Sequence, residues 1–131
     1  MKIKRILIAN RGEIAVRIIK TARKMKIETV AVKTSVEPNA LFLTMADIVF
    51  DNTEDSTDIT VFLNIERLVD IALKTGSDAV HPGYGFLAEN AYFAQKCSDN
   101  GIVFIGPSPD SIYKMGNKTI ARKIALASGI P

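Results

Sequence analysis

Residues 5–19 read Arg-Ile-Leu-Ile-Ala-Asn-Arg-Gly-Glu-Ile-Ala-Val-Arg-Ile-Ile, and this stretch predicts the fold class. It begins with a continuous apolar run over residues 5–9, which is typical of a parallel strand buried on both faces. A segment with helical spacing follows over residues 12–25, and its apolar side carries Ile14, Ile18, Ile19, Ala22 and Met25. A buried strand that leads directly into an amphipathic helix is the repeating unit of an α/β fold.

The same alternation continues along the chain. Further strands are predicted at residues 29–33, 47–50, 78–81 and 102–106, and further helices at 39–46, 64–75, 90–100, 109–115 and 117–128. This order predicts a Rossmann-like, doubly wound parallel sheet of about five strands, in the order 3-2-1-4-5, with helices on both faces. Ligands of such sheets bind at the carboxyl ends of the strands, where we expect Asn10, His81 and Gly106.

Local signals mark the segment between the third and fourth strands. Residues 51–58 are polar and acidic, and we interpret them as a solvated surface loop. Asn64 is the expected N-cap of the helix after it, and Gly76 is expected to end that helix. The residues of this helix that are predicted to face inward are Ile65, Leu68, Val69, Ala72 and Leu73.

The composition is that of a single compact domain. The chain has 131 residues, of which 47% are hydrophobic and 24% charged. Its apolar runs are all far shorter than the roughly 20 residues that span a bilayer, so we predict no membrane segment. The single cysteine, Cys97, cannot form an internal disulfide, which favours a cytoplasmic location. One histidine and one cysteine do not make a common zinc site, and no metal site is predicted.

The charge is unevenly distributed around a net value of +3. Residues 1–33 and 111–131 carry most of the Lys and Arg, whereas residues 34–110 carry most of the acids. A nucleic-acid surface would combine such basic stretches with aromatic residues for base stacking, and the basic stretch at residues 1–33 has no aromatic residue. Solvated helix faces therefore explain the charge better, and we predict no nucleic-acid partner.

The first candidate loop is Asn-Arg-Gly-Glu-Ile-Ala at residues 10–15. It lies where a helix begins, and the free amides and partial positive charge of a helix N-terminus suit an anion. A dinucleotide fingerprint needs three glycines in G-x-G-x-x-G order, and this loop has only Gly12, which argues against NAD or FAD. A tight turn explains Gly12 and Glu13 without a ligand, but it does not explain Arg11.

The second candidate loop is His-Pro-Gly-Tyr-Gly-Phe-Leu-Ala-Glu-Asn at residues 81–90. Pro82 biases His81 away from helical angles, and two glycines flank Tyr84. Such a loop brings backbone amides close to a ligand and holds one aromatic hydroxyl outward. A buried tyrosine over a glycine-rich turn is the structural alternative, but ten such residues at a strand's carboxyl end favour a site.

The third candidate is Met-Gly-Asn-Lys-Thr at residues 115–119. A lysine in the first turn of a helix opposes the helix dipole unless an anion lies nearby, so Lys118 and the free amides favour a phosphate. The intervening Asn117 and the lack of an upstream glycine break the P-loop pattern. Taken alone, a lysine such as Lys118 is more often a solvated surface residue than a ligand.

Together these motifs resemble the N-terminal domain of the biotin carboxylase family. Ile-Ala-Asn-Arg-Gly-Glu-Ile-Ala at 8–15 is similar to the family's first motif, and the loop at 81–90 is similar to its second. Phe-Ile-Gly-Pro at 104–107 and Met-Gly-Asn-Lys at 115–118 resemble the third and fourth motifs, the last of which usually reads Met-Gly-Asp-Lys. The resemblance covers essentially the whole chain in the family's order.

The resemblance implies a reaction in two steps. ATP activates bicarbonate as carboxyphosphate, and the CO₂ it yields is placed on N1 of biotin, which is held on a biotin carboxyl carrier protein or domain. A carboxyltransferase then uses the carboxyl group, as in acyl-CoA (for example acetyl-CoA) and pyruvate carboxylases. The catalytic residues and the ligands of Mg²⁺ or Mn²⁺ are implied to lie in an ATP-grasp domain, which is absent from this chain together with the C-terminal domain. A homodimer is implied for the full-length form.

The resemblance also implies roles for named residues. Lys118 matches the family's ATP-phosphate lysine, and Gly83, Tyr84 and Gly85 match the loop that borders the biotin ureido ring. Arg11 and Gly12 are implied to lie at a neighbouring strand end and are further cofactor-binding candidates.

One stretch departs from the family pattern. Residues 34–38 read Thr-Ser-Val-Glu-Pro where the family usually has Ser-x-Ala-Asp-Arg, and Phe42 stands where it commonly has His. The local loop geometry at 34–49 is therefore not predicted from the resemblance.

Two hypotheses of function remain open. In the first, residues 1–131 are the N-terminal, pre-ATP-grasp domain of a biotin carboxylase and are inactive alone. In the second, the chain is a free-standing nucleotide- or phosphate-binding module without catalysis. The coding sequence downstream of Pro131 separates the two.

Overall fold

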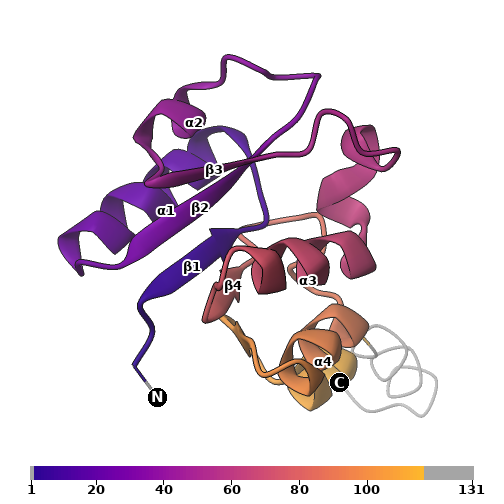
Figure 1. Ribbon diagram of the computed structural model, residues 1–131. Coiled ribbons are helices and arrows are strands. Elements are labelled where there is room, and N and C mark those ends of the chain that lie inside the picture. The colour runs from indigo at the N-terminus through magenta and orange to yellow at the C-terminus, as the bar shows by residue number, and fades with distance from the viewer. Residues whose placement is uncertain (1, 117–131) are drawn as a thin grey trace, which may run out of the picture.

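The computed structural model describes residues 2–116 (Figure 1). Its elements are β1 (Arg5–Ile8), α1 (Gly12–Lys24), β2 (Glu28–Lys33), α2 (Leu41–Met45), β3 (Ile48–Asp51), the 3-10 helix η1 (Asp58–Leu63), α3 (Ile65–Lys74), β4 (Ala79–His81), α4 (Ala91–Asp99), β5 (Val103–Phe104) and α5 (Pro109–Gly116). The helix that the sequence predicts at residues 117–128 lies outside the described residues.

The five strands form one parallel sheet in the order β3-β2-β1-β4-β5, which confirms the predicted order. In the register of the central strands, Ile6 of β1 lies between Thr29 of β2 and Ala79 of β4. Since all strands run the same way, their carboxyl ends lie at one edge of the sheet.

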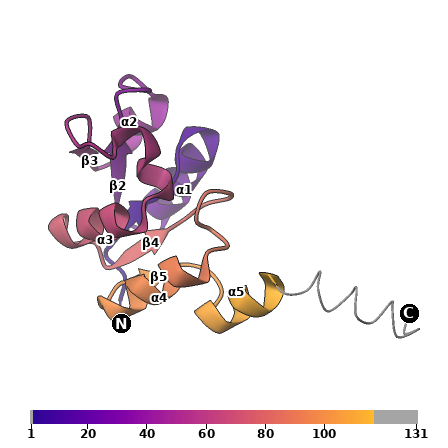
Figure 2. The ribbon, with the colours of Figure 1, turned by 90° about the vertical axis from the view of Figure 1, so that its right-hand side faces the viewer.

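Helices cover both faces of the sheet, as the alternation predicts. On one face, α1 and α2 pack with Ile8 and Ala31 in a smaller core. On the other, η1, α3 and α4 pack with Leu7, Val30 and Val32 in the larger core. The period of two along each strand sends successive side chains to opposite cores, so strands buried on both faces read as continuous apolar runs. Figure 2 shows α5 beside α4, on the β4–β5 side of the molecule.

Helix ends carry the capping residues that local chemistry favours. The Asn64 side chain accepts a hydrogen bond from the Arg67 amide at 2.9 Å and so caps α3 as predicted. Asn90 caps α4 in the same way through the Phe93 amide. Gly76 follows α3 with a φ of +66°, the left-handed geometry that ends many helices.

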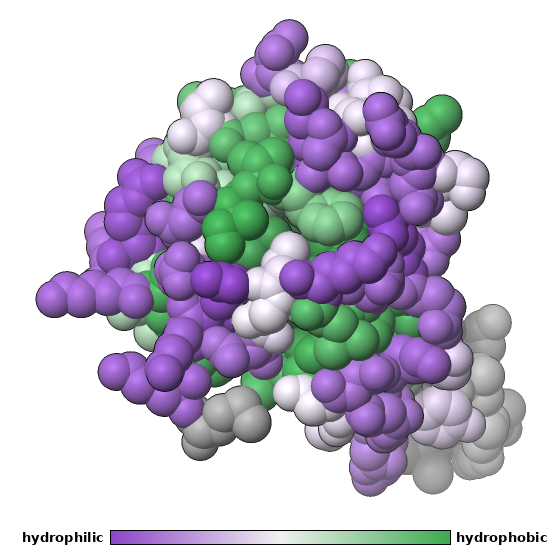
Figure 3. All heavy atoms as spheres, in the orientation of Figure 1, coloured by the Kyte–Doolittle hydropathy of each residue, from purple (hydrophilic) through white to green (hydrophobic). Residues whose placement is uncertain are grey.

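Two residues predicted to face inward lie on the surface instead. The Leu73 side chain, in the last turn of α3, is 53% exposed, while Ile71 is buried. The buried arc of α3 centres on Leu68 and Ala72, and Leu73 lies at its border, so that prediction was wrong. Met25 follows the end of α1 and is also exposed. Apolar side chains show between hydrophilic ones on the face drawn in Figure 3, as on most folded proteins.

The interpretation of residues 51–58 as a solvated loop was wrong for two of its members. Asn52 is 1% exposed, and its Oδ1 accepts from Arg67 Nε at 2.8 Å. Asp58 is 5% exposed and begins η1, and its Oδ2 accepts from the Ser35 amide at 2.9 Å. Side chains distant in sequence therefore hold this acidic segment against the domain.

Cys97 is buried in the larger core, as predicted from its place in an amphipathic helix. Burial raises the pKa of its thiol to about 12, since the thiolate would lose its hydration there. None of the helices within residues 2–116 combines the length and the apolar character needed to cross a bilayer.

Candidate functional site

The loops that begin at Asn10, His81 and Gly106 follow strands β1, β4 and β5 at the same edge of the sheet. Ile8 of β1 pairs with His81 of β4, and the Ala9 amide donates to the His81 carbonyl at 2.9 Å. On the other side of β4, the Ile105 amide donates to the Val80 carbonyl at 2.9 Å. The backbone ladder thus brings the loops that begin at Asn10, His81 and Gly106 to one edge, as the sequence predicts.

A buried asparagine ties the first loop to the second. Asn10 is 3% exposed, and its Nδ2 donates to the Pro82 carbonyl at 2.9 Å and to the Tyr84 carbonyl at 2.8 Å. Its Oδ1 accepts from the Arg11 amide at 2.8 Å. Both N–H donors of this side-chain amide and one of its two acceptor sites are therefore used. These bonds fix the backbone of residues 82–84 against the end of β1.

Gly83 is required by this close approach. Its φ is +66°, and a Cβ at this position would lie 2.5 Å from Asn10 Nδ2 and 2.8 Å from Ile14 Cγ2. Gly85 also has a positive φ, +72°, but a Cβ there would meet no atom within 4 Å. The two glycines around Tyr84 therefore differ: the first lets two segments meet, and the second only turns the chain.

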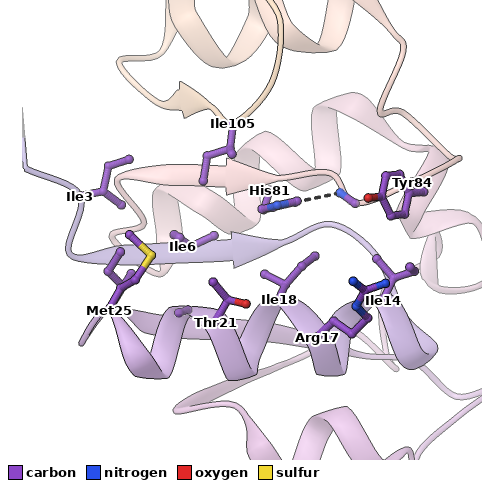
Figure 4. A pocket seen from close by; sticks show the side chains of 13 residues that line it. Ile3, Ile6, Ile14, Arg17, Ile18, Thr21, Met25, His81, Tyr84 and Ile105 are labelled. Carbon is purple, nitrogen blue, oxygen red and sulfur yellow. Dashed lines mark hydrogen bonds between the residues drawn. The ribbon is translucent and has the colours of Figure 1, made fainter.

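Tyr84 projects from this fixed backbone toward solvent. Its side chain is exposed, with 73% of the residue's surface accessible, so the alternative of a buried tyrosine over a glycine-rich turn is excluded. Figure 4 shows the Tyr84 ring at one end of a cavity. Strands β1 and β4 line one side of this cavity, and α1 lines the opposite side. The exposed hydroxyl and the exposed backbone of Gly85 form a polar rim at the carboxyl edge.

The cavity beside Tyr84 is mostly apolar and measures about 540 Å³. Its polar members are Arg17 and Thr21 from α1 and His81 from the end of β4. The isoleucines that line it are Ile3, Ile6, Ile14, Ile18, Ile27 and Ile105. It lies between α1 and the strands β1 and β4, on the side of the sheet that carries the smaller core.

His81 has an ordered partner within the loop. Its Nδ1 accepts a hydrogen bond from the Gly83 amide at 3.0 Å, the contact drawn as a dashed line in Figure 4. Burial lowers the pKa of His81, because the protonated ring would lose hydration beside the apolar cavity. Asn10 and His81 are the residues that hold the loop, and the sequence analysis placed both at the edge without assigning them a role.

Arg11 and Gly12 lie next to the Tyr84 loop in the backbone, but the Arg11 side chain belongs to a different hollow. It forms an ion pair with Glu37, and the hydrogen bond from Arg11 lowers the pKa of that carboxyl. Arg11 and Glu37 line a smaller cavity of about 250 Å³ together with Val36, Ile59 and Phe86. Gly12 begins α1 with a φ of +64° and leaves open space where a Cβ would be.

The third candidate lies at the limit of the structure. Met115 is the last residue before Gly116 in α5, and Lys118 lies outside the described residues, so its phosphate role stays a prediction. Across residues 2–116, the His, Cys, Asp and Glu side chains do not gather in threes that could hold a metal ion.

Comparison with known families agrees with this arrangement. A family model described as "Biotin carboxylase, N-terminal domain" matches residues 2–112. Biotin carboxylase 1 of Bacillus subtilis is 50% identical over 98% of this chain and 28% of its own length. The mitochondrial pyruvate carboxylase of Rattus norvegicus is 43% identical over 98% of this chain and 11% of its own length.

Solved structures give the same result. The biotin carboxylase domain of a thermophilic 2-oxoglutarate carboxylase, solved with bicarbonate, superposes with a TM-score of 0.85 at 43% identity, covering all of this chain and 29% of that one. The complete pyruvate carboxylase of Rhizobium etli superposes with a TM-score of 0.86 at 38% identity, over 13% of its length. This chain thus spans less than a third of the relatives it matches, and it belongs to the biotin carboxylase family, in the region of that family's N-terminal domain.

Proposed function

We propose that this chain forms the biotin-side wall of an ATP-dependent biotin carboxylase, which carboxylates biotin on a carrier protein with ATP and bicarbonate. The observation that carries the proposal is the Tyr84 loop, held at the carboxyl edge of the sheet by Asn10, with an exposed hydroxyl. Membership of the family supports the chemistry. The rest of the active site, including the groups that bind the metal ion, belongs to a polypeptide region beyond residues 1–131.

The described loop fits a polar, uncharged ring such as the biotin ureido group. Such a ring offers one carbonyl acceptor and two N–H donors, and it needs partners that add no charge. The Tyr84 hydroxyl donates or accepts as required, and the exposed backbone of Gly85 adds an amide without a side chain in the way, while its carbonyl already accepts from the Ala88 amide at 2.9 Å. Gly83, Tyr84 and Gly85 are therefore the residues that would hold biotin.

Nucleotide binding is assigned to the end of this chain. Lys118 would place a positive charge on an ATP phosphate, and Asn117 and the first amides of its predicted helix would add donors. A relative supports this: the biotin carboxylase domain dimer of the Hydrogenobacter thermophilus 2-oxoglutarate carboxylase was solved with MgADP, ADP and bicarbonate. By the same likeness we propose a homodimer for the full-length protein. A carboxyltransferase partner and a cytoplasmic location stay predictions.

The test is biotin-dependent ATP cleavage by the full-length polypeptide that contains this domain. With bicarbonate and Mg²⁺ present, free biotin should increase phosphate release, and labelled bicarbonate should appear in carboxybiotin. Residues 1–131 alone should fold but release no phosphate, because the metal and bicarbonate ligands lie elsewhere. Phosphate release by the purified fragment that disappears in Lys118→Ala would contradict the proposal that the metal and bicarbonate ligands lie outside residues 1–131. A full-length protein that cleaves ATP without response to biotin would contradict the proposed carboxylation of biotin.

A further inference from the structure

The side chains of Asn10 and His81 hold the loop that carries Tyr84 by hydrogen bonds to the backbone of three consecutive residues. Asn10 Nδ2 donates to the carbonyls of Pro82 and Tyr84, and His81 Nδ1 accepts from the Gly83 amide between them. The bond to His81 spans two residues and closes a small turn at the end of β4. An imidazole nitrogen that accepts a hydrogen bond carries no proton, so the His81 ring in this arrangement is neutral, with its proton on Nε2.

We propose that His81 is a positioning residue for biotin: its neutral imidazole holds the Gly83 amide and thereby the orientation of Tyr84, and protonation of the ring releases the loop. The inference rests on the proposed role of Tyr84 at the biotin ring. His81 itself does not need to touch biotin, because it acts through the backbone of Gly83.

The surroundings of His81 favour the neutral ring near neutral pH. Burial lowers its pKa, and the basic side chain that lines the same cavity among the described residues is Arg17 on α1. Tyr84 is the other titratable group along that cavity in the described residues, and the side chains that β1 and the residue after β5 contribute, Ile6 and Ile105, are apolar. After protonation, Nδ1–H and the Gly83 amide would be two donors facing each other, so the hydrogen bond is lost.

The direction of the pH effect follows from linkage. Because the pKa of His81 in the fold lies below its ordinary value of about 6.5, the loop is fully held above that pH. As the pH falls through the lowered pKa, the ring gains a proton and the loop loses this bond. Biotin binding should therefore weaken at acidic pH, with ATP binding spared.

Two substitutions separate the acceptor from the titration. In His81→Asn the side-chain oxygen can accept from the amide two residues on, as in an Asx turn, and the group does not titrate. In His81→Leu the side chain keeps part of the histidine volume but has no atom that can accept from the Gly83 amide. The asparagine variant is thus a rescue variant at neutral pH and a control at acidic pH.

The experiment measures the KM for free biotin and the kcat/KM for ATP in the full-length polypeptide between about pH 5.5 and 8.5. Wild type should show a biotin KM that rises at the acidic end, and His81→Leu a biotin KM about three- to tenfold high at every pH, the range expected for one neutral hydrogen bond. His81→Asn should match wild type at pH 8 and lack the acidic rise that belongs to His81. The kcat/KM for ATP should be the same in all three at pH 8.

The proposal is overturned if His81→Leu leaves the biotin KM unchanged, or if His81→Asn keeps the full acidic rise. If His81→Leu does not fold, the comparison of wild type with His81→Asn decides alone. If wild type shows no biotin response, the proposed function fails, and nuclear magnetic resonance of the ¹⁵N-glycine-labelled protein decides about positioning. The Gly83 amide should then show a high protection factor, that is, an exchange rate far below the intrinsic rate at the same pH, in wild type and His81→Asn at pH 8, and a lower protection factor in wild type at acidic pH. A wild-type protection factor that is the same at all pH values would overturn the proposal.

Discussion

Asn10 and Gly83 lie so close that no side chain fits between them: a Cβ on Gly83 would lie 2.5 Å from Asn10 Nδ2. This contact joins the loop after β1 to the loop after β4, and it lets one amide bind the carbonyls on both sides of Gly83. The shape of the candidate site thus depends on a packing relationship between residues more than 70 positions apart.

Substitution of the two glycines around Tyr84 should have unequal effects. Gly83→Ala should lower the free energy of unfolding by about 2–5 kcal/mol, since the positive φ and the overpacking against Asn10 and Ile14 both oppose a Cβ. In Gly85→Ala, the matched control, the added Cβ meets open space. The free energy of unfolding should therefore fall only by the cost of a side chain at a positive φ, about 1–2 kcal/mol. Urea denaturation of residues 1–131 measures both. Equal losses would show that the close approach to Asn10 contributes nothing.

Arg67 should be important for the acidic segment at residues 52–58. Its Nε donates to Asn52 at 2.8 Å, its Nη1 donates to Asp70 at 2.8 Å, and its guanidinium lies 5.3 Å from the centre of the Phe50 ring. Arg67→Lys keeps the charge but loses the planar fork, and should lower the free energy of unfolding by about 1–3 kcal/mol.

The matched control is Lys74→Gln, which removes an exposed pair with Asp70 and should change the free energy of unfolding by no more than about 0.5 kcal/mol. Urea denaturation again provides the measurement. If Arg67→Lys is as mild as Lys74→Gln, the segment is not held by Arg67 in the way its contacts indicate.

Cys97 should make the domain less stable at alkaline pH. Burial raises its pKa to about 12, so the unfolded chain loses the thiol proton first as the pH rises above the ordinary thiol value of about 8.5. Above that pH the contribution of Cys97 to the free energy of unfolding should fall by on the order of 1 kcal/mol per pH unit.

The measurement is the difference in unfolding free energy between wild type and Cys97→Ala at pH 8 and pH 10. The difference should shrink between these values, and a thiol reagent should label Cys97 slowly in the folded protein and quickly in urea. Rapid labelling of the folded protein at pH 8 would contradict the burial of this side chain.

The sheet could be predicted because its signals are local. Apolar runs, helical periods and the alternation between them give the strand order, and the strand order brings Asn10 and His81 to one edge. Asn64 and Gly76 could be assigned for the same reason, since each acts on the backbone within a few residues.

Side-chain partners distant in sequence could not be predicted. Asn52 and Asp58 are polar and were interpreted as solvated, but in the interior Arg67 donates to Asn52 Oδ1 and the Ser35 amide donates to Asp58 Oδ2. The ion pair between Arg11 and Glu37 likewise joins a loop that matches the family to the stretch that departs from it. Phe42, which stands in that stretch where the family commonly has His, is buried and packs in the smaller core.

We propose that the Tyr84 loop binds biotin and that Lys118 binds ATP, and two variants of the full-length polypeptide separate these roles. Tyr84→Phe removes one exposed hydroxyl and should raise the KM for biotin about three- to tenfold, with the kcat/KM for ATP nearly unchanged. Lys118→Ala removes a charge-assisted hydrogen bond to phosphate and should lower the kcat/KM for ATP about ten- to a hundredfold, with little effect on folding.

The most direct test is a pair of steady-state series on wild type and these two variants, the first varying free biotin and the second varying ATP. We expect a crossed result, in which each variant is impaired toward one substrate and close to wild type toward the other. Lys118→Ala with an unchanged ATP dependence, or Tyr84→Phe with an unchanged biotin dependence, would contradict the assignment of the two ligands to these two parts of the chain.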